Sequence, residues 1–150
     1  TVSGRWPREL PEKRLREYGD WAESDLPGTK LFRFSRLVCS HEDLDDCIAY
    51  FTENKVDLIL LVYGAFTGDD IACGLADACR RPIILWAPRE ERWERQDRLY
   101  ANALCCAAMN GASLTRLHAP HHVVFGDKEE DRVVTELHNL TAAYAVITRS

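Results

Sequence analysis

Two short, continuously apolar runs dominate this chain, one at residues 58–62 and one at residues 83–86, with an amphipathic segment between them. Both are apolar at successive positions, a pattern typical of strands buried on both faces of a parallel sheet. The stretch therefore predicts a strand, a helix and a second, parallel strand. Because ligands of open parallel sheets bind at the carboxyl ends of the strands, a site is expected at residues 63–68 and 86–90.

Strand and helix patterns alternate along the rest of the chain. Helices are predicted over residues 7–23 and 99–112, and strands over residues 31–38 and 121–125. The alternation predicts an α/β fold: a doubly wound, flavodoxin-like parallel sheet of about four to five strands with helices on both faces. Only residues 1–4 are available for a strand before the first helix, so we expect the first strand to be incomplete.

Local signals mark several helix ends and faces. Ser40 with Asp43 predicts an N-cap for a helix, and Thr67 with Asp70 repeats the arrangement. Gly111 predicts the end of the helix over residues 99–112. The final helix is expected to bury Val133, Leu137, Leu140, Tyr144 and Ile147.

Composition indicates one ordinary domain over residues 1–150, since 46% of the residues are hydrophobic. The net charge of −5 gives no electrostatic reason to bind nucleic acid or an anionic membrane. Residues 89–98 interleave four arginines with four carboxylates, which is typical of a solvated helix or loop. No apolar run approaches the ~20 residues of a membrane span and no signal sequence is evident, so a cytoplasmic protein is expected.

The six cysteines contain no C-x-x-C pair and no accompanying histidines at zinc-finger spacing. We interpret them as reduced core residues. Cys105 and Cys106 are expected inside a helix rather than at its positive end, where a thiol would be activated.

Other candidate sites have simpler explanations. Gly4 and the turn at residues 64–68 could present N–H groups to an anion, but tight strand-to-helix turns account for the glycines. His121 and His122 would point to opposite faces of a strand, which disfavours joint metal binding. Asp69 and Asp70 fit the first turn of a helix through its macrodipole. No catalytic set can be assembled from the residues alone.

Several segments in order resemble the N-terminal, flavodoxin-like domain of the L-fucose isomerase and L-arabinose isomerase superfamily, particularly its fucose-isomerase-like members. They are SGR (3–5), VDLIL (56–60), YGAFT (63–67), RPIILWA (81–87), NALCCAA (102–108) and VVFGD (123–127). The order and spacing of these motifs carry the resemblance, which spans nearly the whole chain.

The resemblance implies a Rossmann-like domain of a longer protein of carbohydrate metabolism. Members of the superfamily are intramolecular oxidoreductases that interconvert aldoses and ketoses with a divalent metal, typically manganese. Their metal ligands lie in later domains, so this chain is expected to bind no cofactor and to lack activity alone. Its implied partners are the remaining domains of the parent protein, neighbouring subunits of a homo-oligomer, and the sugar substrate.

The resemblance also implies sugar-binding residues. Arg5 matches the family's Gly-Arg loop, and Tyr63 with Gly64 matches its Tyr-Gly turn. Trp86 and Arg89 follow at the next strand end. The Trp86 ring could stack on a sugar, and the alternative is that it packs under the adjacent loop. The Arg89 guanidinium could bind sugar hydroxyls, and the alternative is an ion pair with Glu90 or Glu91. Fucose isomerases proper carry a tryptophan just before this turn where the chain has Leu61, so the sugar is not specified.

Two functions follow. The first is a substrate-selecting and assembly domain of a metal-dependent sugar isomerase, which predicts exposed apolar surface where other domains or subunits dock. The alternative is a stand-alone flavodoxin-like module that binds a small anionic or sugar ligand, which predicts a closed surface and a complete first strand.

Overall fold

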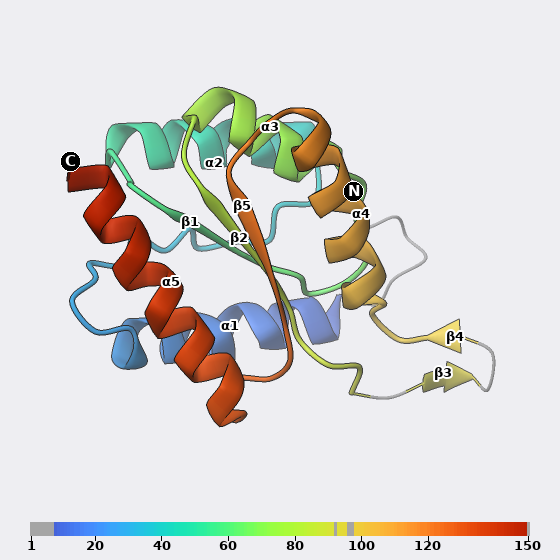
Figure 1. Ribbon diagram of the computed structural model, residues 1–150. Helices are drawn as coiled ribbons and strands as arrows, with labels where there is room; N and C mark the ends of the chain where they lie inside the picture. The colour runs from blue at the N-terminus through green and yellow to red at the C-terminus, as the bar shows by residue number, and fades with distance from the viewer. Residues whose placement is uncertain (1–7, 92, 96–97, 150) are drawn as a thin grey trace.

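A parallel sheet between two layers of helices forms the body of the protein (Figure 1). The computed structural model describes residues 8–91, 93–95 and 98–149. In chain order the elements are α1 (Glu9–Asp25), α2 (His41–Glu53), β1 (Ile59–Val62), α3 (Asp70–Cys79), β2 (Ile83–Ala87), β3 (Trp93–Arg95), β4 (Arg98–Leu99), α4 (Ala103–Arg116), β5 (His121–Phe125) and α5 (Asp131–Arg149).

The sheet has the order β1-β2-β5, with all three strands parallel. Ile83 of the central strand is aligned with Ile59 on one side and with His121 on the other. Every residue of β2 is buried, as its continuous apolar run predicted. The parallel α/β architecture is therefore confirmed.

The expected number of strands is wrong for the part of the chain that the structure describes, where the parallel sheet has three. Residues 31–38 have the predicted apolar alternation but form no strand. Their arginines hold them to the neighbouring helices: Arg33 Nη2 donates to the carbonyl oxygen of Leu15, and Arg36 binds Asp43. A strand pattern defines a segment's faces, but only a paired neighbour makes it a strand.

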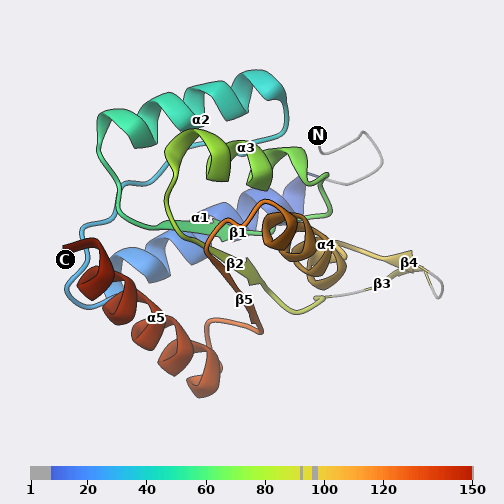
Figure 2. The ribbon, with the colours of Figure 1, turned by 45° about the horizontal axis from the view of Figure 1, so that its top comes forward.

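Helices cover both faces of the sheet, as expected (Figure 2). Along β2, Ile83, Leu85 and Ala87 pack in the core beneath α2, α3 and α4. The alternate residues Ile84 and Trp86 pack on the other side, against α1 and α5.

Helix ends follow local signals only in part. Ser40 caps α2, its Oγ accepting a hydrogen bond from the N–H of Asp43 as predicted. The equivalent prediction for Thr67 is wrong, because Asp69 is the N-cap of α3 and the Thr67 hydroxyl donates to the carbonyl oxygen of Gly68. Gly111 does not end α4. A Cβ there would lie 3.2 Å from Val123 Cγ2, so this glycine permits close packing of α4 on β5.

The described residues of the charged stretch 89–98 contain strands rather than a helix. β3 and β4 pair there as a separate, two-stranded antiparallel sheet. The predicted start of the following helix at residue 99 is therefore wrong, because Leu99 belongs to β4 and α4 begins at Ala103.

The predicted buried face of α5 holds for Val133 and Leu137 but not for Ile147, which is 64% exposed. Nineteen helical residues extend about 28 Å, whereas the five residues of β5 extend about 17 Å. The last turns of α5 therefore reach beyond the sheet that buries the first ones.

Candidate functional site

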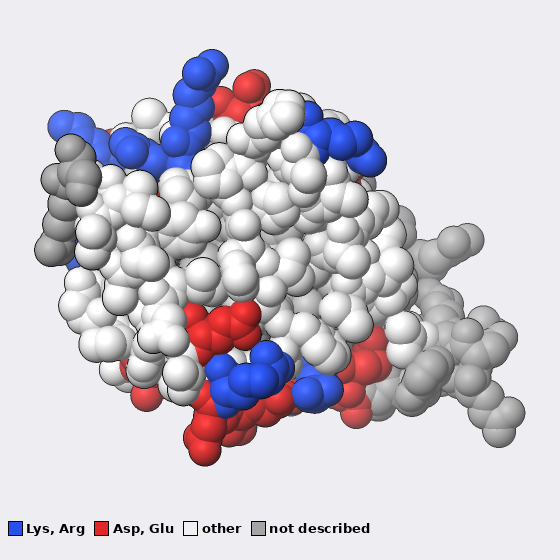
Figure 3. Space-filling view, viewed as in Figure 1, with Lys and Arg blue, Asp and Glu red and all other residues white. Residues whose placement is uncertain are grey.

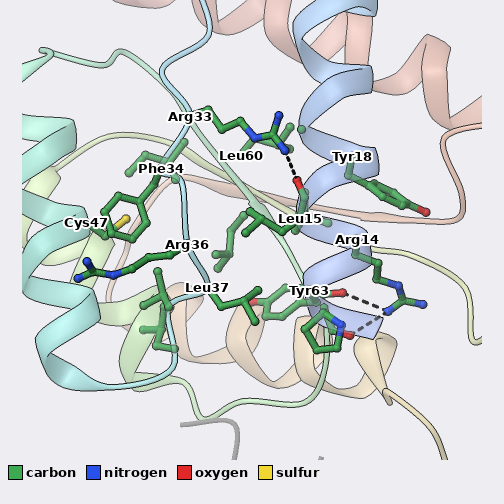
Figure 4. A pocket seen from close by; sticks show the side chains of 18 of the residues that line it. Arg14, Leu15, Tyr18, Arg33, Phe34, Arg36, Leu37, Cys47, Leu60 and Tyr63 are labelled. Carbon is green, nitrogen blue, oxygen red and sulfur yellow. Dashed lines mark hydrogen bonds between the residues drawn. The ribbon is translucent and has the colours of Figure 1, made fainter. Parts of the chain in front are cut away.

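Arg14 joins the carboxyl ends of β1 and β2 from its place on α1. Its Nη1 donates to the carbonyl oxygens of Tyr63, at 3.2 Å, and Gly64, at 3.3 Å (Figure 4). Its Nη2 donates to the carbonyl oxygen of Arg89 at 2.6 Å. The side chain is 1% exposed, and burial lowers the pKa of its guanidinium.

Sequence reasoning placed Arg14 on a helix but gave it no role. It follows Leu10 and precedes Tyr18 at intervals of four residues, and both neighbours are buried. An arginine in the apolar register of a helix was the signal that could have identified it, because such a charge is buried only with acceptors around it.

A second group of polar side chains lies at the ends of β2 and β5. Arg89 binds Glu130 with two hydrogen bonds, from Nε at 2.6 Å and from Nη2 at 3.0 Å. Asp127 accepts from the Arg89 N–H and from the Tyr18 hydroxyl. The Arg89 hydrogen bond is the main cause that lowers the pKa of Glu130 to about 2. We name Arg14, Tyr18, Arg89, Asp127 and Glu130 the strand-end cluster.

Arg89 is thus an ion-pair residue, although its partner is Glu130 rather than the predicted Glu90 or Glu91. Glu90 instead accepts hydrogen bonds from the N–H groups of Ala101 and Asn102, both at 2.8 Å. These two bonds hold the start of α4 against the end of β2. Glu91 pairs with Lys13 of α1.

Trp86 lies wholly in the core. Its side chain is 0% exposed, and Nε1 donates to the carbonyl oxygen of Gly126 at 2.8 Å. The ring meets Tyr18 and Trp21 edge-on, with centroids at 4.7 and 5.2 Å. The packing alternative therefore describes this residue, and stacking on a sugar would require the core to open.

Tyr63 and Gly64 form the turn after β1 (Figure 4). Tyr63 is 2% exposed, and its buried hydroxyl has no hydrogen-bond partner among the described residues. A Cβ at Gly64 would lie 2.7 Å from the Pro11 backbone, so glycine is needed where α1 crosses the strand end. Arg5, the fifth predicted sugar-binding residue, lies outside the described residues.

Cys106 lies in the first turn of α4, although the sequence predicted it inside the helix rather than at its positive end. Its thiol donates to the Thr67 carbonyl oxygen at 3.1 Å and accepts from the Thr67 N–H at 3.3 Å. Burial raises its pKa to about 11 despite the helix N-terminus. This thiol therefore fastens the turn after β1 to α4 and is not an activated nucleophile.

The two strand histidines diverge as predicted. His121 Nδ1 lies 2.9 Å from the Ala119 carbonyl oxygen, and His122 Nε2 lies 2.9 Å from Glu136 on α5. Across the described parts of the chain, no three His, Cys, Asp or Glu side chains are grouped so that they could hold a metal ion.

The carboxyl edge is thus built mainly of side chains that bind one another or the main chain. Such an arrangement fixes the turns after the strands. None of the helices in the described residues has the length and apolarity to cross a membrane. No family model, curated protein or solved structure was found to match the chain.

Proposed function

We propose that this chain is the substrate-selecting and assembly domain of a metal-dependent aldose–ketose isomerase and does not catalyse the reaction alone. The observation that carries the assembly role is the uncharged outer face of α4. Thirteen successive residues, 103–115, include no Asp, Glu, Lys or Arg. A surface helix normally carries charged residues on its outer side, so this composition favours a helix that is covered on that side too.

The side chains on this face are small or apolar. Leu104 is 46% exposed and Met109 is 37% exposed, and residues between and beside them add to the same stripe. We name this stripe the α4 face; it comprises Leu104, Cys105, Ala108, Met109 and Ala112. In Figure 3 the charged side chains gather above and below a broad uncharged band. The accessory-domain hypothesis predicts exposed apolar surface of this kind, whereas the stand-alone module predicts a closed surface.

A second copy of the chain is the partner that suits the α4 face. An uncharged face meets its own copy without like-charge repulsion, which a charged face would suffer. Ala108, Ala112 and Cys105 would let two helices approach closely. This pairing would be the neighbouring-subunit contact that the resemblance implies.

The substrate-selecting role rests on the Tyr63–Gly64 turn and on the resemblance. Arg14 fixes both carbonyl groups of that turn, which keeps its shape constant at the edge where open sheets bind ligands. The divalent metal, manganese in the family, would be held by other domains of the parent protein. The described residues offer no ligand set for it, so no step of the reaction is assigned to them.

The test is to express the whole open reading frame that encodes this chain, supply Mn²⁺, and assay pentoses and deoxyhexoses for aldose–ketose interconversion. Turnover of at least one sugar is expected. No turnover with any of them would contradict the isomerase role. Specific binding of a sugar or small anion by residues 1–150 as a monomer, without turnover by the whole protein, would favour the stand-alone module.

A pair of matched variants tests the assembly role. Ala108→Asp places a charge on the α4 face, whereas Ala49→Asp places the same charge on the exposed side of α2. Sedimentation velocity should show an oligomer for the wild type and Ala49→Asp, and smaller species for Ala108→Asp. A monomeric wild type, or equal behaviour of the two variants, would contradict assembly through this face.

A further inference from the structure

A groove runs along the outer edge of β1, between this strand and residues 31–38. It consists of two cavities of about 200 Å³ and about 440 Å³, the first toward the carboxyl end of the strand and the second toward its amino end. The two cavities are continuous, because both are lined by Leu31, Phe32, Phe51, Ile59 and Leu60. Together the two cavities follow the whole length of β1.

The same helices that cover the sheet cover this groove. Leu15, Tyr18 and Ala22 of α1 line one side of the first cavity, and Cys47 and Phe51 of α2 line the other. Figure 4 shows these two walls with the segment that carries Arg33, Phe34, Arg36 and Leu37. The groove is therefore a gap within the sheet layer and not a hollow on its surface.

The edge of β1 that faces the groove is unpaired. The N–H groups of Ile59 and Tyr63 donate to the carbonyl oxygens of Pro82, just before β2, and of Trp86 in β2, both at 3.0 Å. Backbone groups alternate between the two sides of a strand, so those of Leu60 and Val62 point away from β2. Among the described residues they have no hydrogen-bond partner.

The opposite wall is unpaired too. No backbone hydrogen bond within the described residues involves residues 31–38; the segment is held by side chains, with Arg33 on α1 and Arg36 on Asp43 and Asp46. Nearly all main-chain N–H and C=O groups in a native interior are paired. A strand placed in the gap between these two unpaired backbones could form main-chain hydrogen bonds with both.

The side chains of β1 also suit a central strand. Its sequence is ILLV, with no Lys, Pro or bulge of the kind that protects an exposed edge. Three of its four residues are only partly buried, whereas all five residues of β2 are buried. A strand on the free side of β1 would complete that burial.

From these observations we propose that the groove receives an extended apolar strand, parallel to β1, which pairs with both β1 and residues 31–38. The strand is a segment of the same polypeptide that precedes Thr1 and leads into α1. With it, residues 31–38 become a strand, and the parallel sheet has five. The proposal does not depend on sugar isomerisation or on the α4 face.

The polarity of α1 identifies the occupant. The start of α1 lies at the carboxyl end of β1, where Pro11 meets Gly64 and Arg14 binds Tyr63. Its end lies at the amino side, where Leu26 lines the second cavity with Val56. A helix that runs opposite to a parallel sheet follows a strand that ends where the helix begins. The strand before α1 would therefore run parallel to β1 and finish beside its carboxyl end.

The experiment adds a designed six-residue strand of valine and isoleucine before Thr1 and follows amide hydrogen exchange at Leu60 and Val62. In the unextended chain both amides should exchange rapidly, and the extension should slow them at least about tenfold. The control carries proline at alternate positions of the extension, which removes N–H donors, and should leave both amides fast. Ile59, already bonded to Pro82, is the internal reference.

Two results would overturn the proposal. One is rapid exchange at Leu60 and Val62 in the extended chain. The other is slow exchange in the unextended chain, because residues 31–38 or a second copy would then already pair with β1. If the extended chain does not fold, the same strand is added as a fluorescent peptide to the intact chain. Fluorescence anisotropy should then report binding of this peptide but not of its proline control. Equal behaviour of the two peptides would also overturn the proposal. Whether Ala108→Asp loses its oligomers does not affect these exchange rates. The strand proposal and the assembly proposal can therefore be tested independently.

Discussion

Arg14 Nη2 lies 2.6 Å from the carbonyl oxygen of Arg89, although 75 positions separate the two residues in the chain. Nη1 of the same guanidinium reaches the carbonyl oxygens of Tyr63 and Gly64. One buried side chain of α1 therefore fixes the backbone just after the carboxyl ends of two neighbouring strands, β1 and β2. The turns that the resemblance associates with sugar binding depend on this residue for their position.

Replacing Arg14 by methionine should strongly destabilise the protein. Three carbonyl groups would lose a charged donor while the apolar stem of the side chain is kept, and we expect the free energy of unfolding to fall by about 2–4 kcal/mol. Urea unfolding measures the change. Arg16→Met, at an exposed position of the same helix, should stay within about 0.5 kcal/mol of the wild type. Equal effects of both substitutions would show that the three hydrogen bonds contribute little.

Glu130 should make stability depend on pH in the acid range. Its pKa in the folded state is lowered from 4.5 to about 2, chiefly by the hydrogen bond from Arg89. The contribution is therefore fully present above about pH 4.5 and is lost as the pH falls toward 2. Unfolding midpoints of Glu130→Gln should fall less steeply than those of the wild type across this window.

The matched control for Glu130 is Glu53→Gln, at an exposed position on α2. It should keep the wild-type slope between pH 2 and pH 4.5. A Glu130→Gln profile that runs parallel to the wild type would mean that Arg89 does not hold this carboxylate in solution.

Tyr63 and Tyr18 should respond oppositely to removal of their hydroxyl groups. The Tyr63 hydroxyl is buried without a partner among the described residues, whereas the Tyr18 hydroxyl donates to Asp127 at 3.2 Å. We expect Tyr63→Phe to raise the free energy of unfolding by about 1 kcal/mol and Tyr18→Phe to lower it by a similar amount. Chemical denaturation of the two variants compares them directly. A less stable Tyr63→Phe would indicate that this hydroxyl has a bound partner, such as an ordered water molecule.

Cys105 and Cys106 should differ in alkylation although they are adjacent. Cys105 is exposed, while Cys106 is buried with its pKa raised to about 11. At pH 8 in the folded Ala108→Asp variant, in which no second copy should cover Cys105, iodoacetamide should modify Cys106 at least about 100-fold more slowly than Cys105, because Cys106 is buried and the thiolate is the reactive form. Peptide mass mapping over time gives both rates, and denaturation should bring them together. Similar rates in the folded protein would contradict the bond between Cys106 and Thr67.

Patterns of local origin were predicted well. The five residues of β2 form a strand because a short apolar run with β-branched residues suits a position buried on both faces. Ser40 caps α2 because its hydroxyl and the N–H that it binds are three residues apart. The opposite directions of His121 and His122 follow from the alternation of a strand.

Contacts between distant segments were predicted poorly. Gly111 has the character of a helix end, yet it lies within α4, where a Cβ would lie only 3.2 Å from Val123 Cγ2 of β5. The partner of Arg89 was sought among its neighbours but is Glu130, 41 positions away. Residues 31–38 have a strand pattern, but pairing is a property of two backbones and here the second one is missing from the described residues.

The sequence by itself determined the parallel α/β class, the core strands and most helices, because these depend on the spacing of apolar side chains within about ten residues. Tertiary structure decided that Trp86 is buried, that Arg14 fixes two turns, and that a groove lies beside β1. Each of these depends on where segments far apart in the chain meet, and the free energy of burial and hydrogen bonding is gained only when they do.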